Sequence, residues 1–451
     1  MPLTRWLAEY AWLPDHAEPT PDVLIETDDG RITAVAPLTA GTPTAGVEVL
    51  GDAVRLPGLT LPGLANAHSH AFHRALRGRT HAGRGDFWTW REGMYDVAQR
   101  LDPDSYLTLA RAAYAEMVLA GITCVGEFHY LHHGPDGKPY ADPNAMSAAL
   151  VEAAAHAGIR LTLLDTAYLT ATVDGAPLVG PQRRFSDGDA LRWAERVSGF
   201  TPPNDHARVG AAIHSVRAVP AEQLATVAGW AHRNGLPLHV HLSEQPAEND
   251  ACRAVHGCTP TRLLAEHGVL GPHTTAVHAT HPTSADLALL GESRTGICLC
   301  PTTERDLADG IGPARRMAEA GSPLSLGSDS HAVVDLFEEA RAVELDERLR
   351  TRRRGHFAAV ELVTAATVAG HAALGWGDAG RLAVGDRADL VTVRLDSART
   401  AGVPPVGVFF AATAADVSHV VVDGRVVVAE GRHLTVDVPT ELRHAIEEVT
   451  S

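Results

Sequence analysis

The stretch Leu61–His73, LPGLANAHSHAFH, decides how the rest of the chain is interpreted. An apolar run flanked by Gly and Pro is typical of a buried strand, and here it leads into His68-Ser69-His70. Residues two apart on a strand point to the same face, so the two imidazoles leave the strand end side by side. Neutral imidazoles at this spacing suit a divalent transition metal, zinc above all. Among 25 histidines such a pair also arises by chance, as His239-Val240-His241 illustrates, so the remaining sequence has to decide.

The overall composition is that of a globular protein with an excess of acidic groups. The 451 residues are 45% hydrophobic and 21% charged, enough for a large core and more than one domain. The formal net charge of −17 is not offset by any sustained basic stretch, which argues against a nucleic-acid partner. The most basic run, Arg348–Arg354, shares its surroundings with Glu344, Asp346 and Glu347, and we expect it to be a solvated helix end.

The amino-terminal segment and the cysteines bear on location. No basic segment followed by an apolar stretch opens the chain, and no apolar run reaches membrane length, so neither a leader nor a membrane partner is expected. Five cysteines, an odd number without framework spacing, favour a reducing cytoplasm. Cys298-Leu299-Cys300 has a possible reading as two metal thiolates. Because free cysteine packs like a small hydrophobe, core residues on a buried strand are the preferred interpretation.

Short apolar runs alternate with longer helical ones between residues 61 and 374, which is the pattern of a parallel sheet with crossover helices. Eight such strands, each followed by a helix, predict an α/β fold, a (β/α)8 TIM barrel over residues 61–374. An open doubly wound sheet is the alternative, but the first strand leads into His68-Ser69-His70, and residues 61–374 contain no GxGxxG motif. The expected strands are Leu61–Ala67, Thr123–Phe128, Leu161–Ala167, Val209–Ile213, Leu238–His241, Thr275–His278, Gly296–Cys300 and Leu324–Gly327.

Both ends of the chain are rich in β-strand signals. Asp-Gly pairs precede alternating apolar runs at Asp29-Gly30 and Asp423-Gly424, which predicts hairpins. We therefore expect residues 1–60 and 375–451 to form one small composite β-sandwich domain. Its expected strands are Val23–Glu26, Arg31–Ala36, Val47–Leu50, Asp389–Val393, Val417–Val422 and Val426–Ala429.

Polar side chains recur where the predicted barrel strands end. Strand one ends in His68 and His70, strand five in His241, strand six in His278, and strand eight is followed by Asp329. Barrel enzymes build their active sites at these carboxyl-terminal ends, so this recurrence carries more information than any single motif. Three imidazoles and one carboxylate, completed by water, predict a catalytic site for one Zn²⁺ or another divalent transition metal per chain, which would lower the pKa of its water to near 7.

Glu244 and His278 are the candidates for proton transfer and charge stabilisation. Glu244 lies three residues past His241, where a carboxylate can take a proton from water and pass it to a leaving nitrogen. His278 and Asp329 could both be metal ligands, or His278 could orient the water and stabilise developing charge. The simpler alternatives are a helix-start carboxylate for Glu244 and a satisfied core histidine for His278.

These residues resemble the metal-dependent amidohydrolase superfamily. The stretches that carry the resemblance are PGLANAHSH, HVHLSE, the lone His278, LGSDS and the closing GRLAVGDRADLVTV, which together span nearly the whole chain. Many members bridge two metals with a carboxylated lysine, but the one lysine here, Lys138, lies in a turn-like segment. The chain therefore looks like the mononuclear deaminase branch. In that branch the matching residues imply metal ligands at His68, His70, His241 and Asp329, a proton shuttle at Glu244 and an assisting histidine at His278.

Within that branch, further stretches resemble the formimidoylglutamate deiminases of histidine degradation. They are HSHAFHRALRGR, DFWTWREGMY, GEFHYLHH, AIHSVRAV and CLCPTTERDLADG. The resemblance implies hydrolysis of N-formimino-L-glutamate to N-formyl-L-glutamate and ammonia. His73 departs from the pattern, because glutamine is expected there, and this puts the details of one carboxylate contact in doubt. Two alternatives stay open: a mononuclear deaminase of a purine, pyrimidine or pterin, and a non-catalytic scaffold that keeps the barrel.

A dicarboxylate substrate calls for fork-shaped cationic donors. Arg91 and Arg217 match the carboxylate-binding positions of these deiminases, and Arg74 and Arg305 are the alternatives nearby. The commoner fate of an arginine is pairing with an acid at the surface. Hydrogen bonds to the same substrate are expected from Tyr130, His214 and His73. The expected partner is thus a small dicarboxylate, and the expected assembly is a homodimer.

Overall fold

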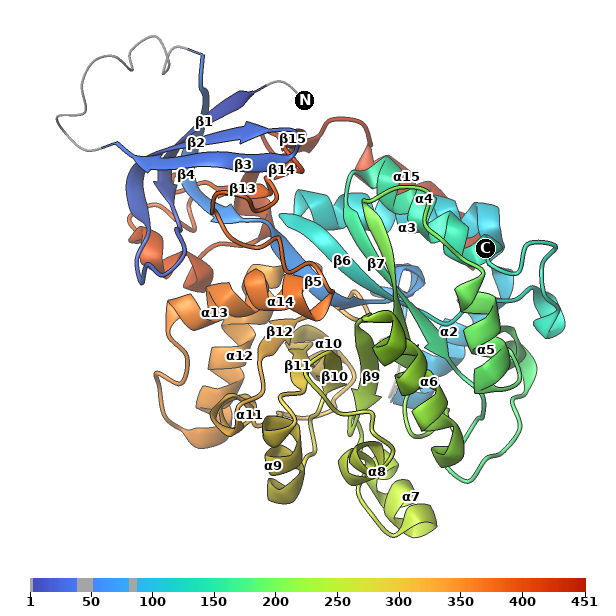
Figure 1. The fold of residues 1–451 in the computed structure, drawn as a ribbon. Helices are drawn as coiled ribbons and strands as arrows, with labels where there is room; N and C mark the ends of the chain where they lie inside the picture. Colours follow the sequence, from blue (N-terminus) through green and yellow to red (C-terminus); the bar gives the residue numbers. More distant parts are fainter. Residues whose placement is uncertain (1–2, 39–51, 81–86) are drawn as a thin grey trace.

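The computed structural model describes residues 3–38, 52–80 and 87–451. Its larger part is a sheet of eight strands, hydrogen-bonded in the order β12-β11-β10-β9-β8-β7-β6-β5 with every neighbouring pair parallel (Figure 1). This confirms the predicted barrel. The strands are β5 (Leu64–Ser69), β6 (Ile122–His129), β7 (Arg160–Ala167), β8 (Ala207–Ile213), β9 (Leu238–Leu242), β10 (Thr274–His278), β11 (Gly296–Leu299) and β12 (Leu324–Leu326).

Helices follow the strands and cover the outside of the barrel (Figure 1). Their ends show the expected local chemistry: Asp102 caps α3 by accepting a hydrogen bond from the Ser105 amide, and Gly158, Gly235 and Gly257 close α4, α6 and α7 in the left-handed region. The helices are α2 (Phe87–Arg100), α3 (Pro103–Leu119), α4 (Ala145–Ala157), α5 (Ala190–Ser198), α6 (Ala221–Asn234), α7 (Pro246–His256), α8 (Pro260–Glu266), α9 (Ser284–Glu292), α10 (Pro301–Asp306), α11 (Ala314–Ala320), α12 (Leu336–Thr351), α13 (Ala359–Ala366) and α14 (Val368–Ala373).

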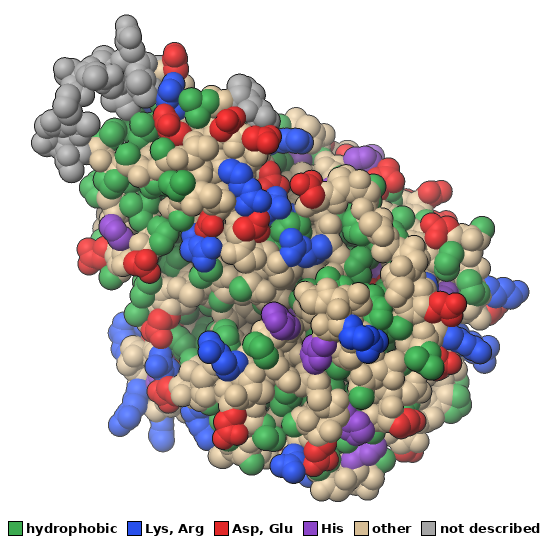
Figure 2. Space-filling view, viewed as in Figure 1, with side chains coloured by type: hydrophobic (Ala, Val, Ile, Leu, Met, Phe, Trp, Pro, Cys, Tyr) green, Lys and Arg blue, Asp and Glu red, His purple; other side chains and the backbone are tan. Residues whose placement is uncertain are grey.

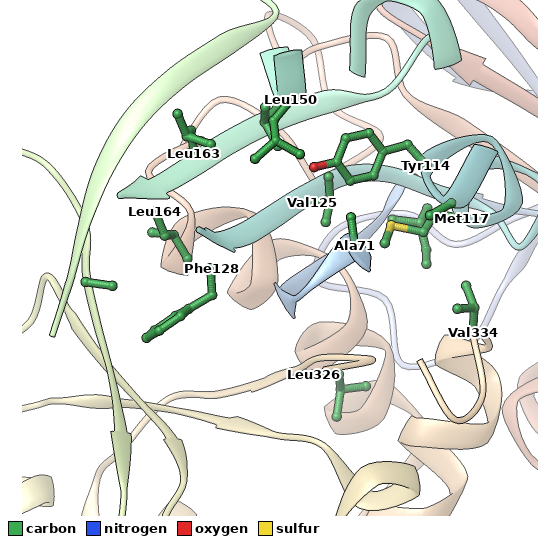
Figure 3. Packing of buried hydrophobic residues seen from close by; sticks show 14 of the residues in the cluster. Ala71, Tyr114, Met117, Val125, Phe128, Leu150, Leu163, Leu164, Leu326 and Val334 are labelled. Carbon is green, nitrogen blue, oxygen red and sulfur yellow. The ribbon is translucent and has the colours of Figure 1, made fainter. Parts of the chain in front are cut away.

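The core lies between the strands and these helices. Every residue of β6 and β7 is buried, as expected for parallel strands covered on both faces. In Figure 3, Tyr114 and Met117 of α3 lie near Val125 of β6, and Leu150 of α4 lies near Leu163 of β7. Burial of each such side chain contributes about 1.5–3 kcal/mol. Short 3-10 turns complete the described part: Ala71–Leu76, Pro135–Gly137, Gly180–Phe185, Pro405–Phe410 and Ala414–Asp416.

The barrel closes where its last strand meets its first. Just beyond β12, the Asp329 amide donates to the carbonyl of His68 (3.0 Å), and the His70 amide donates to the carbonyl of Asp329 (3.2 Å). Asn66, fully buried in β5, accepts from the Ser328 amide (2.9 Å) and bonds the Ser328 hydroxyl (2.7 Å). A Cβ at Gly327 would lie 2.8 Å from that of His68, so only glycine allows this close approach. The closure therefore fixes the backbone of the predicted metal ligands.

The two ends of the chain share a second sheet of eight strands, ordered β16-β15-β14-β13-β4-β1-β2-β3, which lies at one side of the barrel (Figure 1). Strand β4 is the joint, since it is parallel to β1 and antiparallel to β13. This confirms the small β-domain built from both termini. Its strands are β1 (Thr4–Ala11), β2 (Thr20–Asp28), β3 (Arg31–Pro37), β4 (Val54–Pro62), β13 (Leu390–Val393), β14 (Val417–Val422), β15 (Arg425–Ala429) and β16 (Arg432–His433).

Several details differ from the sequence-based expectation. Strand β1 was not expected, although Trp6 and Ala8 alternate with more exposed neighbours and the turn at Pro14-Asp15 follows it. The expected strand Val47–Leu50 lies outside the described residues. The expected first barrel strand, Leu61–Ala67, is divided, because its first two residues end β4 and β5 begins at Leu64.

The carboxyl-terminal helix α15 (Val438–Thr450) lies on α3 of the barrel, where Glu441 pairs with Arg111 at 2.7 Å. The basic run near residue 350 is the exposed end of α12, as expected. Figure 2 shows acidic and basic side chains interspersed across the viewed face. In the described part of the chain, no helix has the length and apolar character needed to cross a membrane.

The closure gives a testable prediction. Asn66→Ala removes both side-chain bonds to Ser328 and leaves buried polar groups without partners, which should lower the free energy of unfolding by about 1–3 kcal/mol. Denaturant unfolding measures the loss, with the exposed Asn204→Ala as the control. Equal stabilities of the two variants would show that this contact does not hold the barrel shut.

Candidate metal centre and substrate pocket

The four predicted ligand side chains meet at the carboxyl-terminal end of the barrel. Oδ1 of Asp329 lies 3.2 Å from Nε2 of His68 and 3.3 Å from Nε2 of His70. Nε2 of His241 lies 3.1 Å from Nε2 of His68. All four ligand atoms are within 4.8 Å of one another, and all four residues are buried. The structure thus brings together ligands from β5, β9 and the segment after β12.

Hydrogen bonds behind two of the rings orient them. Nδ1–H of His70 donates to the carbonyl of Phe128, and Nδ1–H of His241 donates to the carbonyl of His214, both at 2.9 Å. Each ring therefore presents the lone pair of Nε2 to the cluster. Burial lowers the pKa of His70 to about 3 and that of His68 and His241 well below the usual range. The imidazoles are held neutral, which is the form that binds a metal.

This donor set fits a divalent cation. Nitrogen lone pairs and a carboxylate oxygen converge at about 3 Å, an arrangement in which acceptors repel one another unless a positive species lies between them. Three histidines and one carboxylate, with room for water, match a catalytic transition-metal site better than an ordinary polar core.

Glu127, which sequence reasoning missed, supports the ligand-bearing turn. One oxygen of this fully buried carboxylate accepts from the Ala71 amide (2.7 Å), and the other accepts from the Ser69 hydroxyl (3.0 Å). Burial raises its pKa to about 8, although these hydrogen bonds act in the opposite direction. The available signal was an acid inside the otherwise apolar strand GEFH.

His278 and Glu244 face each other beside the ligands. Nε2 of His278 lies 3.8 Å from Oε1 of Glu244 and 3.6 Å from Oδ2 of Asp329, while its Nδ1 lies 3.4 Å from Oε1 of Glu304. Burial alone would lower the pKa of His278, but the carboxylates of Glu244, Glu304 and Asp329 raise it well above the usual value. His278 and Asp329 both have positive φ angles, 68° and 41°, so strain turns them toward the site.

The alternative interpretations, a helix-start carboxylate for Glu244 and a core histidine for His278, do not fit the surroundings of these residues. Glu244 precedes α7, which begins at Pro246, and its carboxylate turns toward the site rather than capping the helix. His278 is buried, yet its neighbours are three carboxylates rather than an apolar core. Their geometry therefore favours roles in proton transfer and charge stabilisation.

A pocket opens beside the ligands and holds about 660 Å³ of space, its mouth included. All five predicted substrate-binding residues line it, and so do ligands and Glu244. Its lining consists of His70, His73, Trp90, Arg91, Met94, Tyr95, Tyr130, Tyr168, Ala171, His214, Arg217, His241, Glu244, Leu307 and Asp329. Apart from Tyr130, the aromatic and apolar members of this set were not predicted, because they come from α2, the segment after β7 and the segment after α10, which carry no metal-site motif.

Hydrogen bonds join the polar residues of this wall. Nε2 of His73 and the hydroxyl of Tyr130 are 2.9 Å apart, so the histidine that replaces the expected glutamine still takes part in the pocket's polar network. Gln182 donates to the hydroxyls of both Tyr95 (3.1 Å) and Tyr168 (3.3 Å). The side chains of the wall are therefore held in place before a substrate enters.

The two predicted carboxylate-binding arginines differ in their surroundings. The guanidinium of Arg91 lies over the ring of Tyr95 at 5.7 Å. Arg217 is engaged by acids, because its Nη2 donates to Glu244 (3.1 Å) and its Nε lies 3.4 Å from Glu248. Sequence reasoning did not anticipate this pairing. Arg217 must therefore hold the proposed proton shuttle as well as meet a substrate.

The alternative arginines face elsewhere. Arg74 pairs with Glu116 at 2.6 Å, and Arg305 pairs with Glu338 at 3.0 Å. Neither is among the residues that line the pocket. The geometry therefore favours the pair first predicted.

The group formed by His278, Cys300 and Asp329 shares its carboxylate with the site described above, and the other residues with ligand-type side chains have structural partners. Among His129, His132 and Asp165, the carboxylate is already clamped by both terminal nitrogens of Arg196 at 2.8 and 2.9 Å. The extra histidine of the second HxH pair, His239, bonds the Ala373 carbonyl through Nε2 at 2.9 Å.

The structure also places the cysteine pair and the lysine that were considered as metal ligands. Cys298 and Cys300 are buried free thiols, as the core interpretation expected. Lys138 is exposed next to a 3-10 turn. It is therefore not a bridging ligand.

Comparison with known proteins agrees with this geometry. The family model described as "Amidohydrolase family" matches residues 59–427, which is most of the chain. The chain belongs to the amidohydrolase family. As a member, it is a hydrolase that acts on C–N bonds, which confirms the expectation of an enzyme of this class.

The relatives fall among deaminases and deiminases. A formimidoylglutamate deiminase of Pseudomonas aeruginosa is 40% identical over 397 residues, covering 84% of this chain and 87% of that one. An 8-oxoguanine deaminase of the same organism is 32% identical over 83% of this chain and 82% of its own. The crystal structure of an amidohydrolase from Brucella melitensis superposes with a TM-score of 0.88 at 32% identity, covering 99% of this chain and 100% of that one. The chain is therefore an amidohydrolase similar to known deaminases.

The ligand set makes a prediction about metal content. Because a single cluster of four ligands converges at the pocket, the dialysed protein should keep about one divalent metal ion per chain. His241→Ala should lose most of it, whereas His239→Ala, two residues away on the same strand, should keep it. Elemental analysis of the three proteins decides. Two tightly held ions per active chain would contradict a mononuclear site.

Proposed function

We propose that this amidohydrolase hydrolyses N-formimino-L-glutamate to N-formyl-L-glutamate and ammonia, as a step of histidine degradation. The observation that carries the proposal is the composition of one pocket: a metal ligand set at one end and two guanidinium groups, Arg91 and Arg217, in its wall. A substrate with a formimino carbon and two carboxylates needs both features. The similarity to the Pseudomonas aeruginosa deiminase supports the same substrate.

The cofactor proposed is one Zn²⁺, or another divalent transition metal, held by His68, His70, His241 and Asp329. When bound, it would supply Lewis-acid chemistry by lowering the pKa of a water and polarising the formimino group. One relative in fold, an adenosine deaminase from Xanthomonas campestris, has a crystal structure described with bound zinc. The donor set of the present chain suits the same ion.

The chain's own residues supply the proton transfers. Oε1 of Glu244 faces His278 and the ligands, so this carboxylate can take a proton from the attacking water and deliver it to the departing nitrogen. His278 lies on the same side, where an imidazole N–H can stabilise negative charge that develops as the tetrahedral carbon forms. Loss of ammonia from that carbon leaves the formyl group.

Substrate binding is assigned to residues that line the pocket beside the ligands. Arg91 and Arg217 offer charge-assisted hydrogen bonds to the two carboxylates. The linked pair of Tyr130 and His73, together with His214, adds neutral donors and acceptors. Leaving a guanidinium unpaired in a buried pocket is costly, so the pocket should reject analogues that lack a carboxylate.

The alternative function is deamination of a purine, pyrimidine or pterin. It is favoured by relatives such as the 8-oxoguanine deaminase and by the aromatic side chains of Trp90, Tyr95 and Tyr168 in the pocket. A neutral heterocycle, however, has no use for two arginines. Ammonia release measured over formiminoglutamate, guanine, cytosine and adenosine separates the two functions and also a non-catalytic scaffold, which would release none.

Two further expectations are kept as proposals. We infer a reducing cytoplasm from cysteines that are all free thiols in the structure. A homodimer is the proposed assembly, and sedimentation velocity tests it.

The proton shuttle gives the next prediction. Glu244→Gln removes the proton carrier without removing a ligand, so turnover should fall about 10²–10⁴-fold while the metal content stays the same. Steady-state ammonia release and elemental analysis measure the two quantities. Near-normal turnover would remove Glu244 from the mechanism, and loss of the metal would identify it as a ligand instead.

The arginines give a prediction about recognition. Arg91→Met or Arg217→Met loses hydrogen bonds to a charged group, worth roughly 1.5–3 kcal/mol, so kcat/KM for formiminoglutamate should fall by about 10–150-fold. Arg217→Met should also lower kcat, because Arg217 holds Glu244. Each variant should discriminate less than the wild type against analogues that lack one carboxylate. Unchanged discrimination in both variants would place the carboxylate site elsewhere.

A further inference from the structure

Glu248 is a buried carboxylate next to the site that the proposed reaction does not use. It lies in the first turn of α7, which directly follows β9 and its ligand His241 (Figure 1). Its side chain is 0% exposed, and unlike Glu244 and Arg217 it does not line the pocket. Burying a charged carboxylate costs free energy unless it is paired, so we expect Glu248 to have a structural or functional role.

The two oxygens of Glu248 have different partners. Oε1 accepts a hydrogen bond from the Ser243 amide at 3.0 Å. Ser243 immediately precedes Glu244 and has a φ of 49°, a conformation that L residues rarely adopt. The bond therefore stabilises the strained turn from which Glu244 projects. Oε2 lies 3.4 Å from Nε of Arg217, and Nη2 of the same guanidinium contacts Glu244.

Arg217 is thereby held between two carboxylates. Its Nε faces Glu248 and the hydroxyl of Ser215, while its Nη2 donates to Oε2 of Glu244. Because Oε2 of Glu244 is fixed in this way, Oε1 is the oxygen that faces His278, whose Nε2 also lies 3.6 Å from the ligand Asp329. Burial raises the pKa of Glu248, whereas Arg217 and the Ser243 amide lower it.

We propose that Glu248 is a positioning residue for the deimination, acting through Arg217 and through the Ser243 turn to hold Glu244 toward the metal ligands. The proposal rests on the proposed function for the choice of substrate. Glu248 touches neither substrate nor metal. Its charge holds the guanidinium beside Glu244, so that Arg217 can orient Glu244 and still contact a substrate carboxylate at the pocket wall.

The decisive variant is Glu248→Gln, because an amide oxygen can still accept from Ser243 while the charge facing Arg217 is removed. We expect kcat/KM for formiminoglutamate to fall about 10-fold or more, with a loss in kcat as well as a rise in KM and with the metal retained. Glu344→Gln is the matched control. Glu344 is also buried, accepts from the amides of Gly355 and Phe357, and pairs with Arg348, but it lies on α12 away from the pocket. This control should lower stability and leave kcat/KM within about two-fold.

A double-mutant cycle separates positioning from general structural support. If Glu248 acts through Arg217, adding Glu248→Gln to Arg217→Met should change kcat/KM by no more than about two-fold, because the pathway is already broken. An equal loss in both backgrounds, an unchanged Glu248→Gln enzyme, or loss of the metal would each overturn the proposal. If Glu248→Gln alone fails to fold, kcat/KM of the double variant is compared with that of Arg217→Met. The double variant leaves no unpaired charge between positions 217 and 248, and a difference of more than about two-fold would contradict the proposal.

The proposed function can fail separately. If the wild-type protein releases no ammonia from formiminoglutamate, the substrate assignment is wrong. The role of Glu248 is then tested with the panel substrate that the wild type does hydrolyse. Wild-type protein that is active, with a Glu248→Gln variant that behaves like the Glu344→Gln control, contradicts only the positioning role.

Discussion

The site depends on the hydrogen bonds that close the barrel between its first and last strands. The amides of Asp329 and His70 each bond a carbonyl across this seam, and Asn66 reinforces it from inside β5. A barrel can bring residues 262 positions apart together, such as Asn66 and Ser328, only if the seam has one register. Since the side chains of His68 and Asp329 leave the backbone at that register, closing the barrel also places these two metal ligands side by side.

Electrostatics then decides what the assembled cluster can do. Burial keeps the imidazoles neutral, and the backbone carbonyls behind His70 and His241 aim their lone pairs inward. Around this cluster, carboxylates outnumber cations: His278 faces three acids and Arg217 faces two. A cation bound at the ligands would balance the excess of negative charge. Arg217 and Arg91 supply the local positive charge that lets an acidic protein bind an anionic substrate.

The barrel and the candidate metal ligands could be predicted from local signals in the sequence, whereas the pocket arginines were predicted from the resemblance to the formimidoylglutamate deiminases. Short apolar runs indicate the strands, and His68, His70 and His241 lie directly at their ends. Strand β1 was missed although its alternation and the turn at Pro14-Asp15 could have indicated it, and Val47–Leu50 lies outside the described residues. What no local pattern reveals is pairing between distant side chains. Glu248 holding Arg217, and Gln182 linking Tyr95 with Tyr168, depend on how helices settle on the barrel.

The central claim is that one cation and two carboxylate-binding arginines share this pocket. A crystal structure of the metal-loaded chain with N-formyl-L-glutamate, recorded at the absorption edge of the metal, tests it most directly. The account predicts one anomalous peak among His68, His70, His241 and Asp329, with the ligand carboxylates on Arg91 and Arg217. A peak at another cluster, or a ligand bound with neither arginine in contact, would contradict it.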